Sequence, residues 1–370
     1  TNLIWASDEA FRIYGAPISD DNLIGLAYVQ QTAITPDRKK LDKALKDLLT
    51  QGKEYNLNFR IIDTDDELHY IHSVATLIKD EDGNPKKVSG VIHDITKLKL
   101  EQDKLLYSST HDHLTNVYNR RYFSEQRMLY DDEKYLPVSF AILDINGLKI
   151  INDSLGHHAG NEVLKRLAQV LERHITDGKN FVSRIGGDEF SIFFANTTHE
   201  QAEERMQHIL DHLSHERIGN IELSIAYGIA VRETMDQSVD EVLKKAEDEM
   251  YLYKISDSQS VRNKIIDALL KTLYEKDNIS EEHSQRVSDY AFFLAKACNL
   301  SNKRTNDIKT AGLLHDIGKI MISNDILNKE GKLTASEYNI IKTHPEKGYR
   351  IIHSIGDMDI IANHVHQHHE

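Results

Sequence analysis

The sequence predicts a multidomain α+β protein, because three segments differ in their pattern of apolar residues. Strand-like runs follow a helix in residues 1–97, a β-α-β-β-α-β order occupies residues 109–258, and residues 259–370 are helical and rich in histidine. These patterns favour an antiparallel sheet, a ferredoxin-like domain and an all-α domain, respectively. A linker helix is expected over residues 98–108.

The composition restricts the classes of function. The chain has 370 residues, a formal net charge of −14 and one cysteine. This acidity disfavours binding to a nucleic-acid polymer. A single cysteine permits no internal disulfide, so we expect a cytoplasmic protein. No apolar run is long enough to span a membrane. Because the chain begins with Thr1 rather than Met, we expect a fragment, and a membrane anchor ahead of Thr1 stays open.

Residues 1–97 have the pattern of an antiparallel sheet with a few helices. Leucines at helical spacing from Leu41 to Leu49 predict a helix that Gly52 ends. Strand-like runs follow at residues 55–62, 67–78 and 87–95. We interpret Trp5 as a core residue. Three histidines are weak cofactor-ligand candidates, more simply surface or hydrogen-bonded residues: His69, His72 and His93.

Three segments of this unit resemble a PAS sensor domain: 59–61, 65–68 and 90–96. In that family the closing Asp-Ile-Thr, here Asp94-Ile95-Thr96, leads into an output helix. The match covers the later two thirds of the fold, which implies that its first strands are missing. Such domains bind haem, flavin, a small metabolite or nothing, and the sequence does not name the signal.

Residues 98–108 belong to a sparse apolar stripe among charges, formed with Ile95 by Leu98, Leu105 and Leu106. This pattern suits a short helix that pairs with its copy in a dimer. A lone amphipathic linker helix explains it equally well.

Neighbouring acidic residues mark the centre of the second unit. Asp188 and Glu189 follow Gly186-Gly187 between two apolar runs, which predicts a tight hairpin whose glycines have positive φ. Asp144 lies near the end of an apolar strand over residues 138–145. These strands can be neighbours in a ferredoxin-like sheet. Asp144 and Asp188 would then converge at one edge and form a site for Mg²⁺ or Mn²⁺.

Four segments of this unit resemble the GGDEF diguanylate cyclases: 112–121, 144–153, 156–160 and 186–190. That family condenses two GTP into cyclic di-GMP by attack of a 3′-hydroxyl on an α-phosphate, and two loaded domains must face each other, which implies a homodimer. The resemblance implies metal binding by Asp144, Asp188 and the Ile145 carbonyl. It also implies substrate binding by Lys149, Asn152 and Lys254. Asp188 and Glu189 are the expected catalytic residues, with Glu189 at the reacting ribose hydroxyl.

One position departs from the family pattern. After the last glycine of its His-containing loop the family usually has Asp, whereas this chain has Asn161. A carboxylate only accepts hydrogen bonds, here from guanine N1 and N2, whereas an amide also presents a donor. Whether Asn161 changes the preference for guanine therefore stays open.

The third unit contains an adjacent His-Asp pair on an otherwise apolar helix face, His315-Asp316, which packing alone explains poorly. His344 stands before Pro345 at a helix start, and His368 and His369 come near the chain end. Imidazole and carboxylate together suit Fe, Mn or Zn rather than Ca²⁺. Cys298 lies at helical spacing from apolar residues, and we interpret it as a core residue.

Five segments here resemble the HD-GYP phosphodiesterases: 282–287, 315–319, 327–334, 344–348 and 368–370. The resemblance implies that Lys319 steadies a phosphate and that six residues bind two metal ions: His283, His315, Asp316, His344, His368 and His369. Members with three metals carry Glu where this chain has Ile279. The family's Gly-Tyr-Pro segment would come after Glu370, so we expect an incomplete phosphodiesterase domain.

The sequence thus favours a bacterial signalling enzyme that makes, and with a complete HD-GYP domain hydrolyses, cyclic di-GMP. Two alternatives stay open. In one, the chain is a phosphodiesterase whose GGDEF unit binds GTP only as a sensor. In the other, it is a non-enzymatic scaffold that responds to nucleotides. The net direction of turnover does not follow from the residues.

Overall fold

The computed structural model describes residues 3–129, 131–175, 178–277 and 281–370. The chain divides into two compact units, Thr1–Ser108 and Ser109–Glu370. In the part of the chain that the structure describes, no helix combines the length and apolar character needed to cross a bilayer.

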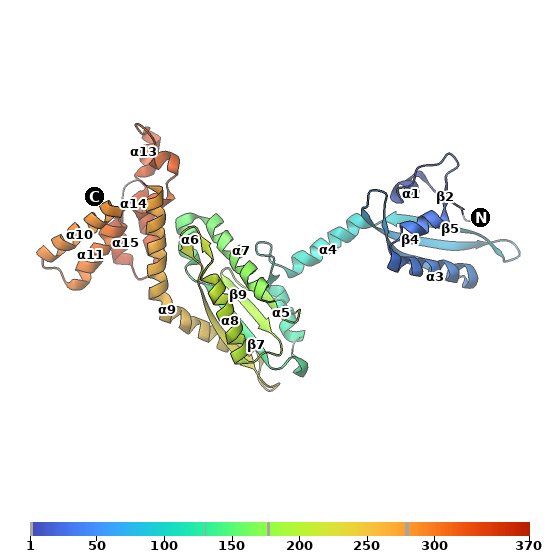
Figure 1. Ribbon diagram of the computed structural model, residues 1–370, viewed down its shortest axis with the longest axis horizontal. Coiled ribbons are helices and arrows are strands. Elements are labelled where there is room, and N and C mark those ends of the chain that lie inside the picture. The colour runs from blue at the N-terminus through green and yellow to red at the C-terminus, as the bar shows by residue number, and fades with distance from the viewer. Residues whose placement is uncertain (1–2, 130, 176–177, 278–280) are drawn as a thin grey trace. The chain divides into compact units, whose positions relative to one another are not determined.

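The first unit contains the antiparallel sheet expected from the sequence (Figure 1). Its strands pair in the order β3 (Tyr55–Ile62), β4 (Leu68–Lys79), β5 (Pro85–Asp94). The helices are α1 (Asp8–Ile13), α2 (Leu26–Thr32) and α3 (Thr35–Gln51), and a separate strand pair joins β1 (Leu3–Trp5) to β2 (Leu23–Gly25). Gly52 ends α3 in the left-handed conformation, with a φ of 65°, as the leucine pattern predicts.

The prediction that Trp5 belongs to the core is wrong, because its side chain is 68% exposed. All residues of β1 are exposed, and Phe11 of α1 occupies the core instead, packed in one cluster with Phe59 and Ile71. Two of the candidate histidines of this unit, His69 and His72, have polar partners. The His69 ring lies between Asp63 and Asp94, and His72 Nδ1 lies 2.7 Å from Asn58 Oδ1.

Helix α4 (Thr96–Thr110) occupies the segment of the expected linker helix. Its leucines are exposed, including Leu98 at 54% and Leu105 at 70%. An exposed apolar stripe with a seven-residue spacing is typical of a helix that pairs with another helix.

The second unit begins with a sheet whose five strands, counted over the described residues, lie in the order β12-β7-β9-β8-β6. They are β6 (Tyr118–Asn119), β7 (Val138–Ile145), β8 (Phe181–Arg184), β9 (Glu189–Phe194) and β12 (Ile225–Arg232). The β7–β9 pairing confirms the neighbour relationship expected from a ferredoxin-like fold. The short parallel strand β6 was not predicted.

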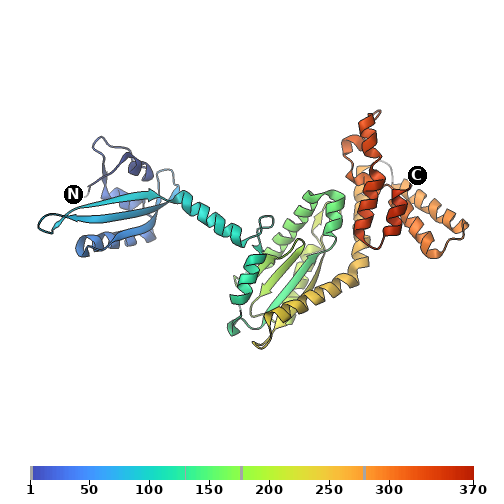
Figure 2. The ribbon, with the colours of Figure 1, turned by 180° about the vertical axis from the view of Figure 1, so that it is seen from behind.

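Alternation along β7 sends side chains into two cores, one on each face of the sheet. Leu143 and Ile145 pack with helices α7 (His157–His174) and α8 (His199–Leu213). Phe140 and Ile142 pack with α5 (Arg120–Leu129) and with the first part of α9 (Val239–Lys276). Figure 2 shows these layers from behind. Smaller elements are α6 (Leu148–Leu155), η1 (Glu133–Tyr135), β10 (Arg217–Ile218) and β11 (Ile221–Glu222).

Helix α9 continues without a break into the helical part of the second unit (Figure 1). The remaining elements are α10 (Glu281–Ala297), α11 (Asn302–Leu314), η2 (Ile317–Met321), α12 (Asn324–Leu327), α13 (Ala335–Ile341), α14 (His344–Ile355) and α15 (Asp359–His366).

The prediction that Cys298 is a core residue is wrong, because this cysteine is exposed. Helix α10 instead buries Ser284, Ser288 and Ala295. These small side chains allow close contact with α11, where a Cβ added to Gly312 would lie 3.0 Å from Ser288 Cα. The packing of α10 on α11 depends on small side chains rather than on apolar ones. Hydrophobicity alone therefore does not identify the buried face of α10.

Candidate functional site

The acidic residues of the second unit gather at one edge of its sheet. Asp144 of β7 stands opposite Glu189 of β9 in the strand register. The N–H of Ile145 donates a hydrogen bond to the carbonyl oxygen of Asp188 at 3.2 Å. The convergence of Asp144 with Asp188 therefore follows from the β7–β9 pairing.

The turn between β8 and β9 corrects the prediction of positive φ at its glycines, because neither Gly186 nor Gly187 is left-handed. The N–H groups of Ile185 and Gly186 both donate to the Glu189 carbonyl. A Cβ on Gly186 would lie 2.5 Å from Glu189 Oε2, whereas no described atom lies within 4 Å of the Cβ position on Gly187. Gly186 therefore leaves room for the Glu189 carboxylate, and Gly187 leaves open space on the turn.

Arg184 fixes this turn, a role that we did not foresee from the sequence. Its guanidinium donates to the Gly187 carbonyl from Nη2 at 2.7 Å and from Nε at 3.2 Å. Nη1 donates to Asp112 Oδ1 at 3.0 Å, and Asp112 in turn accepts from Thr115 Oγ1. The planar fork suits this arrangement. Arg184 thereby connects Asp112, near the start of the second unit, to the acidic turn.

Asp144 is a buried carboxylate with a cationic partner. It is 5% exposed, and Lys254 Nζ of α9 lies 2.7 Å from its Oδ1. Burial raises the pKa of Asp144, the Lys254 ammonium opposes that rise, and the neighbouring Asp188 carboxylate adds to it. The carboxylates of Asp144, which binds the ammonium, and of its neighbour Asp188 are the hard oxygen donors that Mg²⁺ or Mn²⁺ requires. The residues present therefore fit a divalent cation.

The other expected substrate residues lie on α6 and the start of α7. Gly147, with a φ of 69°, precedes α6. Lys149 is exposed on that helix, and Asn161 is exposed in the first turn of α7. Asn152 lies against Gly160, where an added Cβ would be 2.0 Å from Asn152 Oδ1. The structure thus brings Asn152 next to the Gly160–Asn161 segment.

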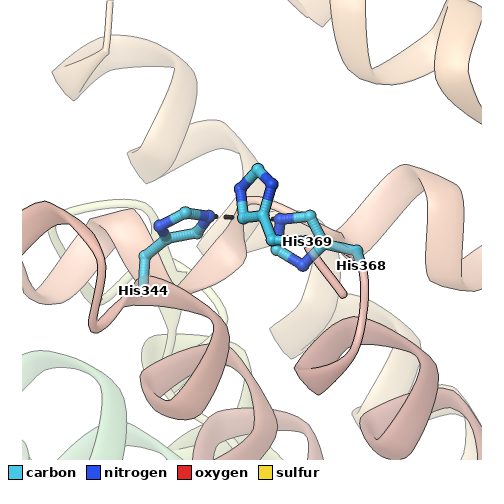
Figure 3. Close-up of side chains that lie close together, drawn as sticks. All are labelled: His344, His368 and His369. Atoms are coloured by element: carbon cyan, nitrogen blue, oxygen red, sulfur yellow. Dashed lines mark hydrogen bonds between the residues drawn. The ribbon is translucent and has the colours of Figure 1, made fainter.

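A second cluster lies in the helical part of this unit. Among the described residues, two groups there have potential metal-binding atoms within 4.8 Å of one another. They are His283, His315 and Asp316, and His344, His368 and His369. Figure 3 shows the second group, in which His344 Nε2 lies 3.1 Å from His368 Nε2. The structure therefore assembles all six ligands implied by the resemblance, whereas residue 279 lies outside the described residues.

Three of these imidazoles are oriented by the same contact. The Nδ1 atoms of His315, His344 and His368 lie 2.6–2.7 Å from the backbone carbonyl oxygens three residues earlier. An Nδ1–H donated to a carbonyl leaves Nε2 as the metal-binding atom, which is how protein metal sites fix a histidine ligand. The backbone thus orients the donors, and the donor set fits a transition metal.

Asp316 links the two groups. Its Oδ1 lies 3.3 Å from His344 Nε2, and its Oδ2 lies 3.1 Å from His315 Nε2. Lys319, 9% exposed on η2, places Nζ 2.9 Å from Asp316 Oδ2 and 3.5 Å from Asp277 Oδ2. Burial would raise the pKa of Asp316, but hydrogen bonds from His315 and Lys319 hold it well below its usual range.

Two histidines of the second group, His344 and His368, have lowered pKa values. Burial lowers the pKa of His344. Burial and the neighbouring His369 lower the pKa of His368 to about 4. A neutral imidazole is the form that binds a metal ion. His344 and His368 therefore present neutral donor atoms near neutral pH. At His315 burial would lower the pKa, but the hydrogen bond with Asp316 outweighs burial and raises it.

Comparison with known families assigns each segment. Residues 109–260 match the family described as diguanylate cyclase, GGDEF domain. Residues 268–370 match the HD domain family, and residues 4–92 match the PAS fold family.

Curated relatives include both cyclases and a phosphodiesterase. Diguanylate cyclase DgcM of Escherichia coli is 30% identical over 44% of this chain and 40% of its own length. A diguanylate cyclase of Vibrio cholerae is 31% identical over 45% of this chain and 53% of its own length. Cyclic di-GMP phosphodiesterase PdeB of Shewanella oneidensis is 28% identical over 42% of this chain and 19% of its own length. The chain therefore spans about half or less of the length of these relatives.

Among solved structures, the coiled coil and GGDEF domain of DgcB from Caulobacter crescentus, in complex with c-di-GMP, is similar at 23% identity. The similarity covers 44% of this chain and 89% of that one, with a TM-score of 0.41. The family matches, in chain order, show that this protein carries a PAS fold, a GGDEF domain of the diguanylate cyclase family and an HD domain.

Proposed function

We propose that the GGDEF domain of this chain condenses two GTP into cyclic di-GMP. The observation that carries this proposal is the convergence of Asp144, Asp188 and Glu189 on adjacent strands, with the Lys254 ammonium against the buried Asp144. Acidic side chains gathered at the end of two strands serve no packing purpose, since like charges repel unless a cation offsets them.

In this proposal the residues of the chain position two reactive groups. Lys149 and Lys254 bind phosphates, and Asn152 with Asn161 contacts the base. Glu189, for which Gly186 leaves room, accepts the hydrogen bond of a 3′-hydroxyl and takes its proton. A 3′-oxygen bond to the α-phosphorus forms as the bond to pyrophosphate breaks, once for each GTP.

Asp144, Asp188 and the Ile145 carbonyl would hold Mg²⁺ or Mn²⁺, which when bound supplies charge stabilisation at the phosphates. Two loaded domains must meet, because each donates one 3′-hydroxyl to the other. The exposed leucines of α4 support a homodimer that brings the domains together.

A phosphodiesterase activity in the HD domain is the second candidate. It is favoured by Asp316, whose two carboxylate oxygens face one histidine from each metal-binding group. One carboxylate between two sets of imidazoles is a suitable arrangement for two ions of Fe, Mn or Zn. Lys319 would neutralise a phosphodiester at this centre, and cyclic di-GMP is the substrate that the neighbouring GGDEF domain suggests.

The cyclase proposal is tested with purified chain, Mg²⁺ and GTP, and products resolved by mass. We expect cyclic di-GMP from the wild type and a loss of at least about 100-fold in Asp188→Ala, because the variant lacks a carboxylate at the reacting phosphates. Asp211→Ala, which removes an exposed carboxylate from α8, is the matched control and should retain activity. Product formation that survives Asp188→Ala would show that the site assignment is wrong.

A further inference from the structure

Helix α6 belongs to two parts of the second unit at once. Leu148 and Ile151 lie in the core beneath the GGDEF sheet. Ile150 points away from that core and lies in the cluster of the HD helices, with Ile265, Ile317 and Ile351 among its members. It is only 7% exposed. An isoleucine on the outer face of a surface helix is explained by this second partner.

The contact is close at the start of the helix as well. A Cβ on Gly147 would lie 2.2 Å from Ile265 Cδ1. The Ile265 side chain of α9 therefore occupies the space that a side chain at position 147 would need. Leu155, at the end of α6, packs against both cores. The whole length of α6 thus lies between the two domains.

Other contacts fix the same arrangement. Asn220, in the turn between β10 and β11, donates from Nδ2 to Glu275 Oε2 at 2.8 Å and to Thr272 Oγ1 at 3.3 Å, both on the last turns of α9. Ala268 of α9 lies in the GGDEF core. Side chains of the GGDEF domain therefore contact those of α9 at the boundary with the HD helices, and residues 109–370 form one compact unit.

The HD elements that contact α6 are those that carry the metal-binding cluster. Helix α6 contacts η2 and α14. The residue before η2 is Asp316, η2 itself carries Lys319, and α14 begins at His344. On the other side, Ile150 lies between Lys149 and Asn152, the residues proposed to bind GTP. Ile150 and the HD residues Ile317 and Ile351 belong to one apolar cluster between these segments.

We propose that α6 couples the two domains, so that a nucleoside triphosphate bound at Lys149 and Asn152 stabilises the metal-binding elements η2 and α14 through Ile150. The inference rests on the proposed nucleotide site. A ligand that orders α6 also orders the elements packed on it, and close-packed interfaces transmit small shifts because they do not deform freely. By linkage the coupling is reciprocal, so an occupied HD centre favours nucleotide binding.

The test is hydrogen exchange of the full chain with and without saturating α,β-methylene GTP, an analogue that cannot be cyclised, in Mg²⁺. In the wild type we expect the analogue to slow exchange in the turn 186–189 and, by about 5-fold or more, in η2 and α14, the range of typical coupling between sites. In Ile150→Asp the turn should still be protected, while η2 and α14 should no longer respond.

Two further variants keep the test decisive. Ile265→Ala removes the side chain that rests on Gly147 without introducing a charge, and it should also weaken the response of η2 and α14. Leu294→Asp, which alters an exposed leucine of α10, is the matched control and should respond as the wild type does.

The outcomes separate the two proposals. A protected turn without any response of η2 and α14 in the wild type would overturn the coupling alone. A response that persists in both Ile150→Asp and Ile265→Ala would also overturn it. An unprotected turn in the wild type would show that the nucleotide does not bind, which overturns the proposed function as well.

Discussion

The ammonium of Lys254 lies 2.7 Å from the Oδ1 atom of Asp144, across 110 residues of sequence. This contact joins α9 to strand β7 at the site proposed for a divalent cation. Lys254 therefore has two roles open to it, as the partner of Asp144 without nucleotide and as a phosphate ligand with it.

Lys254→Met should destabilise the nucleotide-free chain, because Asp144 then keeps a buried negative charge near Asp188 without its cation. The Lys254 side chain is 43% exposed, so solvent screening limits the expected loss in the free energy of unfolding to about 1 kcal/mol. Urea unfolding in EDTA measures it, with Lys244→Met on the exposed side of α9 as control. Equal stability of the two variants would contradict the role given to Lys254.

Arg184→Lys should lower cyclase turnover about 10-fold with little change in KM. Lysine retains the charge but cannot donate to the Gly187 carbonyl and Asp112 together. The carboxylates of Asp188 and Glu189 would then be less well positioned, while nucleotide binding by other residues continues. Steady-state kinetics distinguish the two parameters. Arg217→Lys, in an exposed ion pair with Glu222, is the control, and an equal loss there would remove the special role of Arg184.

Asp316→Asn should reduce the metal content of the HD domain more than His283→Ala does. Asp316 faces histidines of both groups, whereas His283 belongs to one. After loading with Mn²⁺ or Zn²⁺ and gel filtration, elemental analysis should give about two ions per wild-type chain, about one in His283→Ala and fewer in Asp316→Asn. His353→Ala, at an exposed histidine paired with Asp359, should bind as the wild type does. Undiminished metal in Asp316→Asn would contradict the bridging position.

The stability of the PAS unit should decrease as pH rises, through His69. Partial burial would lower the pKa of His69, but hydrogen bonds to Asp94 and Asp63 outweigh burial and raise it above its ordinary value. The protonated form is therefore favoured by folding. Its contribution is fully present below the unfolded pKa of about 6.5 and is lost as pH rises through the higher folded pKa.

Hydrogen exchange in β4 and β5 at pH 6 and pH 8, corrected for intrinsic rates, measures this dependence. His69→Gln should flatten it, whereas His72→Gln, whose partner is the neutral Asn58, should not. A dependence that is unchanged in His69→Gln would place its origin elsewhere.

The double variant Leu98→Asp with Leu105→Asp should dissociate the proposed dimer and lower cyclase activity. Both leucines are exposed on α4 and are seven residues apart, so one partner helix would cover both. Sedimentation velocity gives the mass, and Leu100→Asp, on another side of α4, is the control. A double variant with unchanged mass and activity would show that α4 does not hold the dimer.

Much of the fold could be predicted because its patterns are local. The buried strand Val138–Ile145 is mainly apolar, and its predicted ends agree with the structure. Pairing of β7 with β9 followed from element order, which then placed Asp144 near Asp188. The histidine ligands were found through motif resemblance, since they come from α10, the end of α11, the start of α14 and the segment after α15.

The errors came from properties that hydrophobicity does not encode. Trp5 is apolar but lies on the exposed strand β1, and Cys298 is exposed just after the end of α10, a helix whose buried residues are small. Gly186 is explained by the space Glu189 needs, which a turn pattern does not reveal. Ile150 could have been noticed as an apolar residue outside the core face formed by Leu148 and Ile151, but its partner Ile265 lies more than 100 residues away and only the folded chain identifies it.

The measurement that tests the central claim most directly is product analysis of the wild-type chain with Mg²⁺ and GTP, ATP or both. The arrangement of Asp144, Asp188 and Lys254 predicts cyclic di-GMP from GTP alone. A mixed or adenine product would retain the cyclase and assign altered base choice to Asn161. Bound GTP that yields no product under any condition would contradict the claim and would make the GGDEF domain a nucleotide sensor.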